Sequence, residues 1–170
     1  MRCLGAILAG GQARRFGSDK AHALVGGKRL IDVVGASLAV QCDTVIVCGR
    51  EEPGFACIPD RPEAGQGPLG GLNAALHYAQ AHGFDAVLSS GCDVPNLPSN
   101  LVNQLAGEGA AIVSDQPVVG FWPAELSGRC DAFLKTNRRA LFGFADYINA
   151  RRVEVSPALV NINAPDDLPG

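Results

Sequence analysis

The sequence predicts a three-layer αβα fold, in which helices cover both faces of a mostly parallel β-sheet with an antiparallel edge. Apolar runs of strand length alternate along the chain with segments whose apolar residues recur at helical spacing. This alternation is typical of parallel strands joined by crossover helices. The length of 170 residues suits one compact α/β unit. We therefore expect a single domain over residues 1–170.

The first strand is expected over residues 2–9, which are continuously apolar from Leu4 to Ala9. Residues 29–41 carry apolar side chains at helical intervals and predict the first helix. Further strands are expected at 44–48, 55–58 and 85–90 and in a hairpin made of 110–114 and 117–122. Residues 153–155 and 159–162 are expected to be short extended pieces. Further helices are expected at 69–82, 98–106, 124–134 and 138–150.

Composition excludes several classes of protein. The formal net charge is −3 and basic residues form no run, which argues against a nucleic-acid-binding surface. No stretch approaches the roughly 20 apolar residues that span a bilayer, so no membrane association is expected. The six cysteines include no Cys-x-x-Cys pair and fit buried thiols of a reducing compartment. The short apolar start, followed by Gly10 and Gly11, is better explained as a buried strand than as a signal peptide. We expect a cytoplasmic protein.

The loop after the first strand, LAGGQARRFGSDKA, has the composition of an anion-binding loop. Gly10 and Gly11 let consecutive backbone N–H groups point at one anion, and Arg15 and Lys20 follow within reach. Such a combination suits a triphosphate. The loop matches neither the P-loop nor the dinucleotide-binding pattern. From the residues alone, a glycine-rich turn with two solvated cations is an alternative.

A second glycine-rich segment, DRPEAGQGPLGGLNAAL, begins at Asp60. Pro68 predicts the start of a helix whose free N–H groups face outward near residues 67–70. The Asp60 carboxylate could accept two hydrogen bonds from guanine, one from N1–H and one from the exocyclic amino group. A surface aspartate at the entry of a helix is the simpler alternative.

A third candidate segment is CDVPNLP, where Asp93 follows an apolar strand. In α/β folds ligands bind beyond the carboxyl ends of the strands. Mg²⁺ takes one or two carboxylates together with phosphate oxygens and water, so Asp93 is a candidate ligand. A turn aspartate without a metal is the alternative. The histidines, His22, His77 and His82, belong to no catalytic motif and are expected to be structural.

These segments together resemble the molybdenum cofactor guanylyltransferases, the MobA family of the NTP transferase superfamily. The resemblance rests on LAGGQARRFGSDKA, on Asp60 followed by GPLGG, on CDVPNLP and on NINAPDDL at residues 161–168, in the order of the family. It covers nearly the whole chain. It implies a Rossmann-like fold of the nucleotide-diphospho-sugar transferase type.

The resemblance also implies roles for individual residues. The nucleotide-binding set would be Leu8, Ala9, Gly10, Gly11, Lys20, Asp60, Gly67, Pro68, Leu69 and Gly70. Arg15, Lys20 and Asp93 would be the catalytic residues, and Asp93 would also hold Mg²⁺ as the cofactor. Asn161 and Asn163, whose side chains share one face of an extended segment, would bind the acceptor.

The reaction implied is Mg²⁺-dependent transfer of GMP from GTP to the molybdopterin cofactor, with release of pyrophosphate. Glycine rather than alanine at position 10 favours guanylyl over cytidylyl transfer. The partners implied are GTP, the molybdopterin cofactor and the proteins that deliver and insert the molybdenum cofactor. Two positions depart from the family on the acceptor side, Ala164 where threonine is usual and Gln116 where histidine is frequent. A nucleotidyltransferase with another phosphorylated acceptor and a non-catalytic nucleotide-binding module are therefore alternatives.

Overall fold

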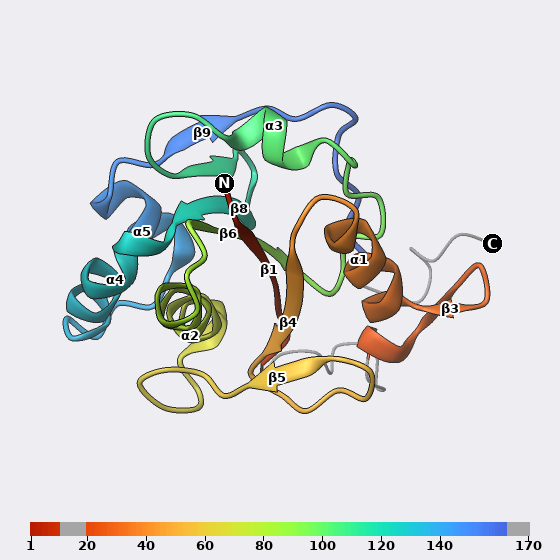
Figure 1. Cartoon of the computed structure of the whole chain (residues 1–170), viewed down its shortest axis with the longest axis horizontal. Helices are drawn as coiled ribbons and strands as arrows, with labels where there is room; N and C mark the ends of the chain where they lie inside the picture. Colours follow the sequence, from red (N-terminus) through yellow and green to blue (C-terminus); the bar gives the residue numbers. More distant parts are fainter. Residues whose placement is uncertain (11–19, 163–170) are drawn as a thin grey trace.

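The computed structural model describes residues 1–10 and 20–162. Its main sheet has seven strands in the order β5-β4-β1-β6-β8-β7-β9 (Figure 1). The strands are β1 (Cys3–Leu8), β4 (Thr44–Cys48), β5 (Ala56–Ile58), β6 (Ala86–Gly91), β7 (Ala111–Val113), β8 (Gln116–Pro123) and β9 (Arg151–Val153). A separate hairpin joins β2 (Leu24–Val25) to β3 (Lys28–Arg29).

Parallel pairing dominates the half of the sheet built from the first part of the chain. Strands β5, β4, β1 and β6 pair in parallel, whereas β8 runs antiparallel to both β6 and β7. The predicted fold class, a mostly parallel sheet with an antiparallel part, is confirmed. The predicted hairpin forms, but it does not end the sheet, because β9 pairs in parallel with β7 on its outer side.

Helices form a layer on each face of this sheet (Figure 1). One face is covered by α2 (Gly67–Ala81), α4 (Ser127–Leu134) and α5 (Leu141–Tyr147), and the other by α1 (Leu30–Ala39) and α3 (Leu101–Leu105). Strand β1 alternates between the two buried layers: Leu4 and Ala6 face one, while Cys3 and Ile7 face the other. Burial on both faces explains why its sequence is continuously apolar.

The structure corrects several expected boundaries. The helix expected over 98–106 is reduced to Leu101–Leu105, and that expected over 138–150 to Leu141–Tyr147. A 3-10 turn, η2 (Ala124–Leu126), precedes α4 within the helix expected over 124–134. The extended piece expected at 153–155 begins earlier in the structure, as β9, and the one expected at 159–162 lies outside the sheet.

The segment before α1 contains two elements that were not expected. It holds a 3-10 turn, η1 (Lys20–His22), and then the β2–β3 hairpin. Gly26 and Gly27 both have positive φ, which is the backbone geometry of a two-residue hairpin turn. Strands of two residues are too short for a period to show in the sequence. No helix in the described part of the chain is long and apolar enough to cross a membrane.

Three neighbouring strands of the sheet end at the same level. Leu8 at the end of β1 lies opposite Cys48 at the end of β4 and opposite Gly91 at the end of β6. The chain therefore emerges from all three strands at one edge of the sheet. That edge is the position at which α/β folds bind ligands.

The only tryptophan is buried in the sheet layer and depends on one hydroxyl. Trp122 donates its indole N–H to Ser89 Oγ at 2.9 Å, and Ser89 donates in turn to the Val118 carbonyl at 2.8 Å. Gly120 makes room for the indole, since a Cβ there would lie 2.8 Å from the ring. The Ser89 hydroxyl thus accepts a hydrogen bond from the Trp122 N–H, which has no access to solvent.

We expect Ser89→Ala to lower the free energy of unfolding by about 1–3 kcal/mol, because it leaves a buried indole N–H without an acceptor. Urea unfolding of the variant measures this loss. Ser99→Ala, at an exposed serine, should change stability by less than about 0.5 kcal/mol. Equal stability of the two variants would contradict the role given to Ser89.

Candidate functional site

The site is built around a close approach of two glycine backbones. Gly49, directly after β4, has φ +95°, and a Cβ at this position would lie 2.7 Å from the Gly10 Cα. The approach is held by flanking backbone hydrogen bonds, from Ala9 N to the Cys48 carbonyl at 3.0 Å and from Gly49 N to the Ile58 carbonyl at 2.9 Å. Only glycine fits both the space and the conformation of position 49.

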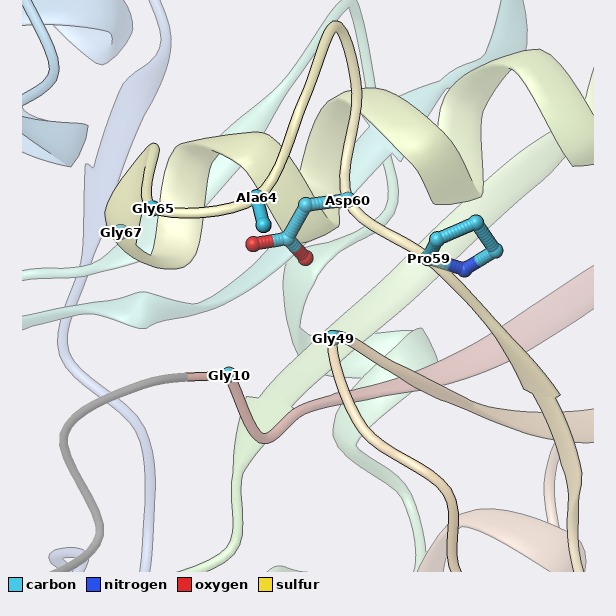
Figure 2. A pocket seen from close by; sticks show the side chains of 7 residues that line it. All are labelled: Gly10, Gly49, Pro59, Asp60, Ala64, Gly65 and Gly67. Carbon is cyan, nitrogen blue, oxygen red and sulfur yellow. The ribbon is translucent and has the colours of Figure 1, made fainter.

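The carboxylate of Asp60 points at this pair of glycines (Figure 2). A Cβ on Gly10 would come within 3.2 Å of Asp60 Oδ2, and one on Gly49 within 2.9 Å of Oδ1. The first turn of α2 closes the other side, where a Cβ on Gly70 would lie 3.3 Å from Oδ2. Glycines therefore surround the carboxylate where larger residues would displace it.

An open pocket of about 310 Å³ lies against these residues. Its lining consists of Gly10, Gly49, Pro59, Asp60, Ala64, Gly65 and Gly67 (Figure 2). The helix α2 begins at this pocket with Gly67 and Pro68, and no side chain caps its N-terminus. Free N–H groups and the positive end of the helix dipole are therefore available beside a carboxylate that accepts hydrogen bonds. The pocket can bind a ligand that is anionic at one end and donates hydrogen bonds at the other.

Asp60 itself is incompletely satisfied. Its Oδ1 atom is buried and has no hydrogen-bond partner within the described residues. Burial raises the pKa of the Asp60 carboxyl above its ordinary value. A buried acceptor without a donor is costly, by about 1–3 kcal/mol for a typical polar group, so a ligand that supplies donors would relieve this cost.

Asp93 lies at the same edge, two residues beyond the end of β6. A Cβ on Gly91 would lie 2.7 Å from Asp93 Oδ1, so the glycine lets the carboxylate fold back over the strand end. Asn161 donates its side-chain amide to Asp93 Oδ2 at 3.4 Å, and Ile162 N donates to the Asp93 carbonyl at 2.8 Å. The C-terminal segment is therefore held against the Asp93 loop.

The residues around Asp93 fit a magnesium ion that is shared with a substrate. Asn161 Oδ1 is buried without a hydrogen-bond partner in the described part of the chain, so it adds an oxygen atom of the kind Mg²⁺ prefers. Residues 1–10 and 20–162 contain no group of three or more metal-binding side chains. One carboxylate with few protein ligands is the pattern of an ion completed by phosphate oxygens and water.

Residues 5–154 match the MobA-like NTP transferase domain. The chain belongs to this family. The family predicted from the sequence is thereby confirmed, and the match includes the three loops that meet at the edge of the sheet. It also includes the β2–β3 hairpin that the sequence did not predict.

Curated relatives of this chain align with nearly its whole length. A molybdenum cofactor guanylyltransferase from Cereibacter sphaeroides is 36% identical over 99% of this chain and 94% of its own length. One from Rhodobacter capsulatus is 35% identical over the same shares. Among solved structures, molybdopterin-guanine dinucleotide biosynthesis protein A from Archaeoglobus fulgidus has a TM-score of 0.76 at 20% identity, covering 97% of this chain and 94% of its own. At that identity the likeness shows the fold.

The structure brings together only some of the predicted site residues. Gly10, Asp60 and Gly67 line the pocket, and Gly70 lies beside Asp60. Leu8, Ala9 and Leu69 are buried in the core, so they can offer a ligand only backbone atoms. Pro68 lies at the start of α2. Lys20 begins the turn η1. Gly11, Arg15, Asn163 and Ala164 lie outside the described residues.

Sequence reasoning missed Gly49 and Pro59 of the pocket. Ala64 and Gly65 lie in the glycine-rich segment that begins at Asp60, which was singled out, but neither was named as a site residue. Gly49 was open to prediction, because it follows the β-branched run TVIVC directly and strand ends were the places where site residues were sought. Its neighbours in the fold, Gly10 and Asp60, are distant in sequence, so the close approach itself has no local signal. The three histidines were expected to be structural, and His77 does bind Asp131 at 2.9 Å outside the pocket.

We expect Gly49→Ala to destabilise the protein more than Gly54→Ala and to abolish nucleotide binding. Gly54 has φ +89° and open space around it, so alanine there carries only the backbone penalty of about 1–2 kcal/mol. Alanine at position 49 carries the same penalty and also collides with Gly10. Thermal unfolding and a nucleotide titration of both variants measure the difference. Equal effects would show that the glycine contact is dispensable.

We expect Asp60→Asn to stabilise the protein at neutral pH. The pKa of the Asp60 carboxyl is higher in the folded than in the unfolded chain, so the folded state stays protonated to a higher pH. The free energy of unfolding therefore falls as the pH rises from the unfolded-state pKa through the folded-state pKa. The amide does not ionise, so its advantage should grow from about pH 3 to about pH 7. Urea unfolding across this range measures it, with exposed Asp115→Asn as the control. An advantage that does not change with pH would contradict the prediction.

Proposed function

We propose that the protein transfers GMP from GTP to the phosphate of the molybdopterin cofactor, forming the guanine dinucleotide cofactor and pyrophosphate. The observation that carries the proposal is the glycine-walled pocket that contains Asp60, whose Oδ1 accepts no hydrogen bond from the described residues. The pocket lies at the edge of the sheet that also holds Asp93. The names of the relatives from Cereibacter sphaeroides and Rhodobacter capsulatus support the same reaction.

Guanine is the base whose edge suits Asp60. It presents two neighbouring donors, N1–H and the exocyclic amino group, which one carboxylate can accept together. Adenine and cytosine offer an acceptor beside their amino group, and an unpaired acceptor facing a carboxylate is unfavourable. The bare backbones of Gly10 and Gly49 form a flat wall on which a purine can lie.

The phosphates would extend from the pocket toward the loop after β1. Gly10 and Gly11, with the side chain of Arg15, would hold the β- and γ-phosphates, while Lys20 would stabilise charge that develops at the α-phosphate. The N–H groups at the start of α2 favour the same negative charge. Holding the α-phosphate in line with its attacker is the main requirement of such a transfer.

Mg²⁺ would be held by Asp93, with Asn161 nearby, and would neutralise charge on the α-phosphate and the leaving pyrophosphate. The bond that forms joins an oxygen of the acceptor phosphate to the α-phosphorus, and the bond that breaks joins the α-phosphorus to the bridging oxygen of pyrophosphate. The attacking phosphate is already ionised, so no strong general base is needed.

Asn161 and Asn163 would bind the acceptor. The position of Asn161 beside Asp93 supports this assignment, because the attacking phosphate must reach the metal-bound α-phosphate. We further propose that the protein works in the cytoplasm with the proteins that deliver and insert the molybdenum cofactor. Six free cysteines, four of them buried, suit a reducing compartment.

In a titration with GTP, CTP, ATP and UTP in the presence of Mg²⁺, we expect GTP to bind best. Asp60→Asn should weaken GTP binding by about tenfold or more, since the amide can accept only one of the two base hydrogen bonds. Asp93→Asn should remove the dependence of binding on Mg²⁺.

Asp115→Asn is the control, because Asp115 is exposed in the turn between β7 and β8. Preference for CTP would argue for a cytidylyltransferase, and binding of no nucleotide would argue for a module without this activity. Pyrophosphate release with another phosphorylated acceptor, and none with molybdopterin, would assign a different acceptor.

A further inference from the structure

A buried glutamate lies three residues after Gly49, which lines the pocket. Glu52 follows β4 in the loop that begins with Gly49, and its side chain is only 1% exposed. Its Oε1 contacts His22 Nε2 at 2.5 Å and Arg29 Nη1 at 3.4 Å, and its Oε2 faces Arg50 Nε at 3.2 Å. The Glu52 carboxylate therefore contacts three basic side chains.

These basic side chains come from different parts of the chain. Arg50 belongs to the same loop as Glu52, His22 to the turn η1, and Arg29 to the end of β3 just before α1. Arg29 is itself fixed by Asp32, which accepts from its guanidinium at 2.7 and 2.9 Å. The cluster thus ties the loop after β4 to residues 20–32.

Burial of its carboxylate distinguishes this cluster from the other ion pairs formed within residues 1–10 and 20–162. Arg152 and Asp146 pair on the surface, where such contacts contribute little. A buried carboxylate is instead strongly unfavourable unless its charge is compensated, so removal of its partners is costly. The turn η1 is also anchored by Ala21, which is completely buried. Its position relative to the loop after β4 is therefore strongly specified.

Both segments joined by Glu52 lead to the proposed nucleotide site. Gly49, which lines the pocket, precedes Arg50 directly. Lys20 lies two residues before His22 in the same turn. A carboxylate that fixes His22 relative to Arg50 also fixes the backbone that carries Lys20 relative to the pocket wall.

We propose that Glu52 is a positioning residue, which holds the turn carrying Lys20 against the nucleotide pocket through His22. This inference rests on the proposed function, because it takes Lys20 to contact the phosphates of the nucleotide. Glu52 touches neither substrate nor metal in this account. It acts through Lys20 alone.

A double-mutant cycle on GTP binding in the presence of Mg²⁺ tests the coupling. The variants are Lys20→Met, Glu52→Gln and the double variant, each checked for folding by circular dichroism and thermal unfolding. We expect Glu52→Gln to weaken GTP binding by about fivefold or more, and Lys20→Met by at least as much. Once Lys20 is gone its position is irrelevant, so the double variant should bind within about twofold of Lys20→Met.

A role of Glu52 in general stability would give a different result. The two losses would then multiply in the double variant, which would overturn the inference, as would wild-type affinity in Glu52→Gln. Neither result would affect the proposed function. Failure of the wild-type protein to bind GTP would overturn both.

Two further variants provide a second test of the coupling and a control. His22→Ala removes one partner whose side chain is 43% exposed, so it should fold even where Glu52→Gln does not, and it should show the same coupling to Lys20→Met with a smaller loss. Glu51→Gln changes the exposed neighbour of Glu52 and should bind GTP like the wild type. Additive losses for His22→Ala and Lys20→Met would also contradict the inference.

Discussion

The close approach of Gly10 and Gly49 is the contact on which the site depends. It is possible because β1 and β4 are hydrogen-bonded neighbours that end in register at Leu8 and Cys48. With no side chain between them, the two backbones leave room for Asp60 to turn its carboxylate inward. The consequence is a buried oxygen that has no donor among residues 1–10 and 20–162, which is a cost to stability that a bound ligand can remove. The buried carboxylate of Asp60 therefore lowers the stability of the free protein and favours the binding of a ligand that donates hydrogen bonds.

The candidate site residues lie in two parts of one sheet edge. Gly10, Gly49, Asp60 and the start of α2 form the pocket, whereas Asp93 and Asn161 meet where β6 ends. Strand β1 lies between β4 and β6, so its carboxyl end at Leu8 lies between the two parts. In the proposed reaction, a nucleotide with its base in the pocket would direct its phosphates past the end of β1 toward Asp93.

Much of this arrangement could be predicted from the sequence, because its causes are local. Runs of mostly apolar or small residues within 2–9, 44–48 and 85–90 predicted the strands, and loops after such strands carry the sites of α/β folds. Asp60 and Asp93 were identified from the motifs that surround them. The glycine contact at Gly49 and the cluster around Glu52 could not be predicted in this way, because each joins residues that are distant in sequence. The hairpin formed by β2 and β3 was not predicted, because strands of two residues are too short to show an alternation of apolar and polar residues.

The proposed guanylyl transfer to molybdopterin can be measured as turnover. The measurement is pyrophosphate release by the wild-type protein with Mg²⁺, GTP and molybdopterin cofactor, together with identification of the product by mass. We expect release that requires both substrates, a guanine dinucleotide product and loss of release in Asp93→Asn. Release with CTP in place of GTP, or none with molybdopterin while another phosphorylated acceptor is used, would contradict this proposal.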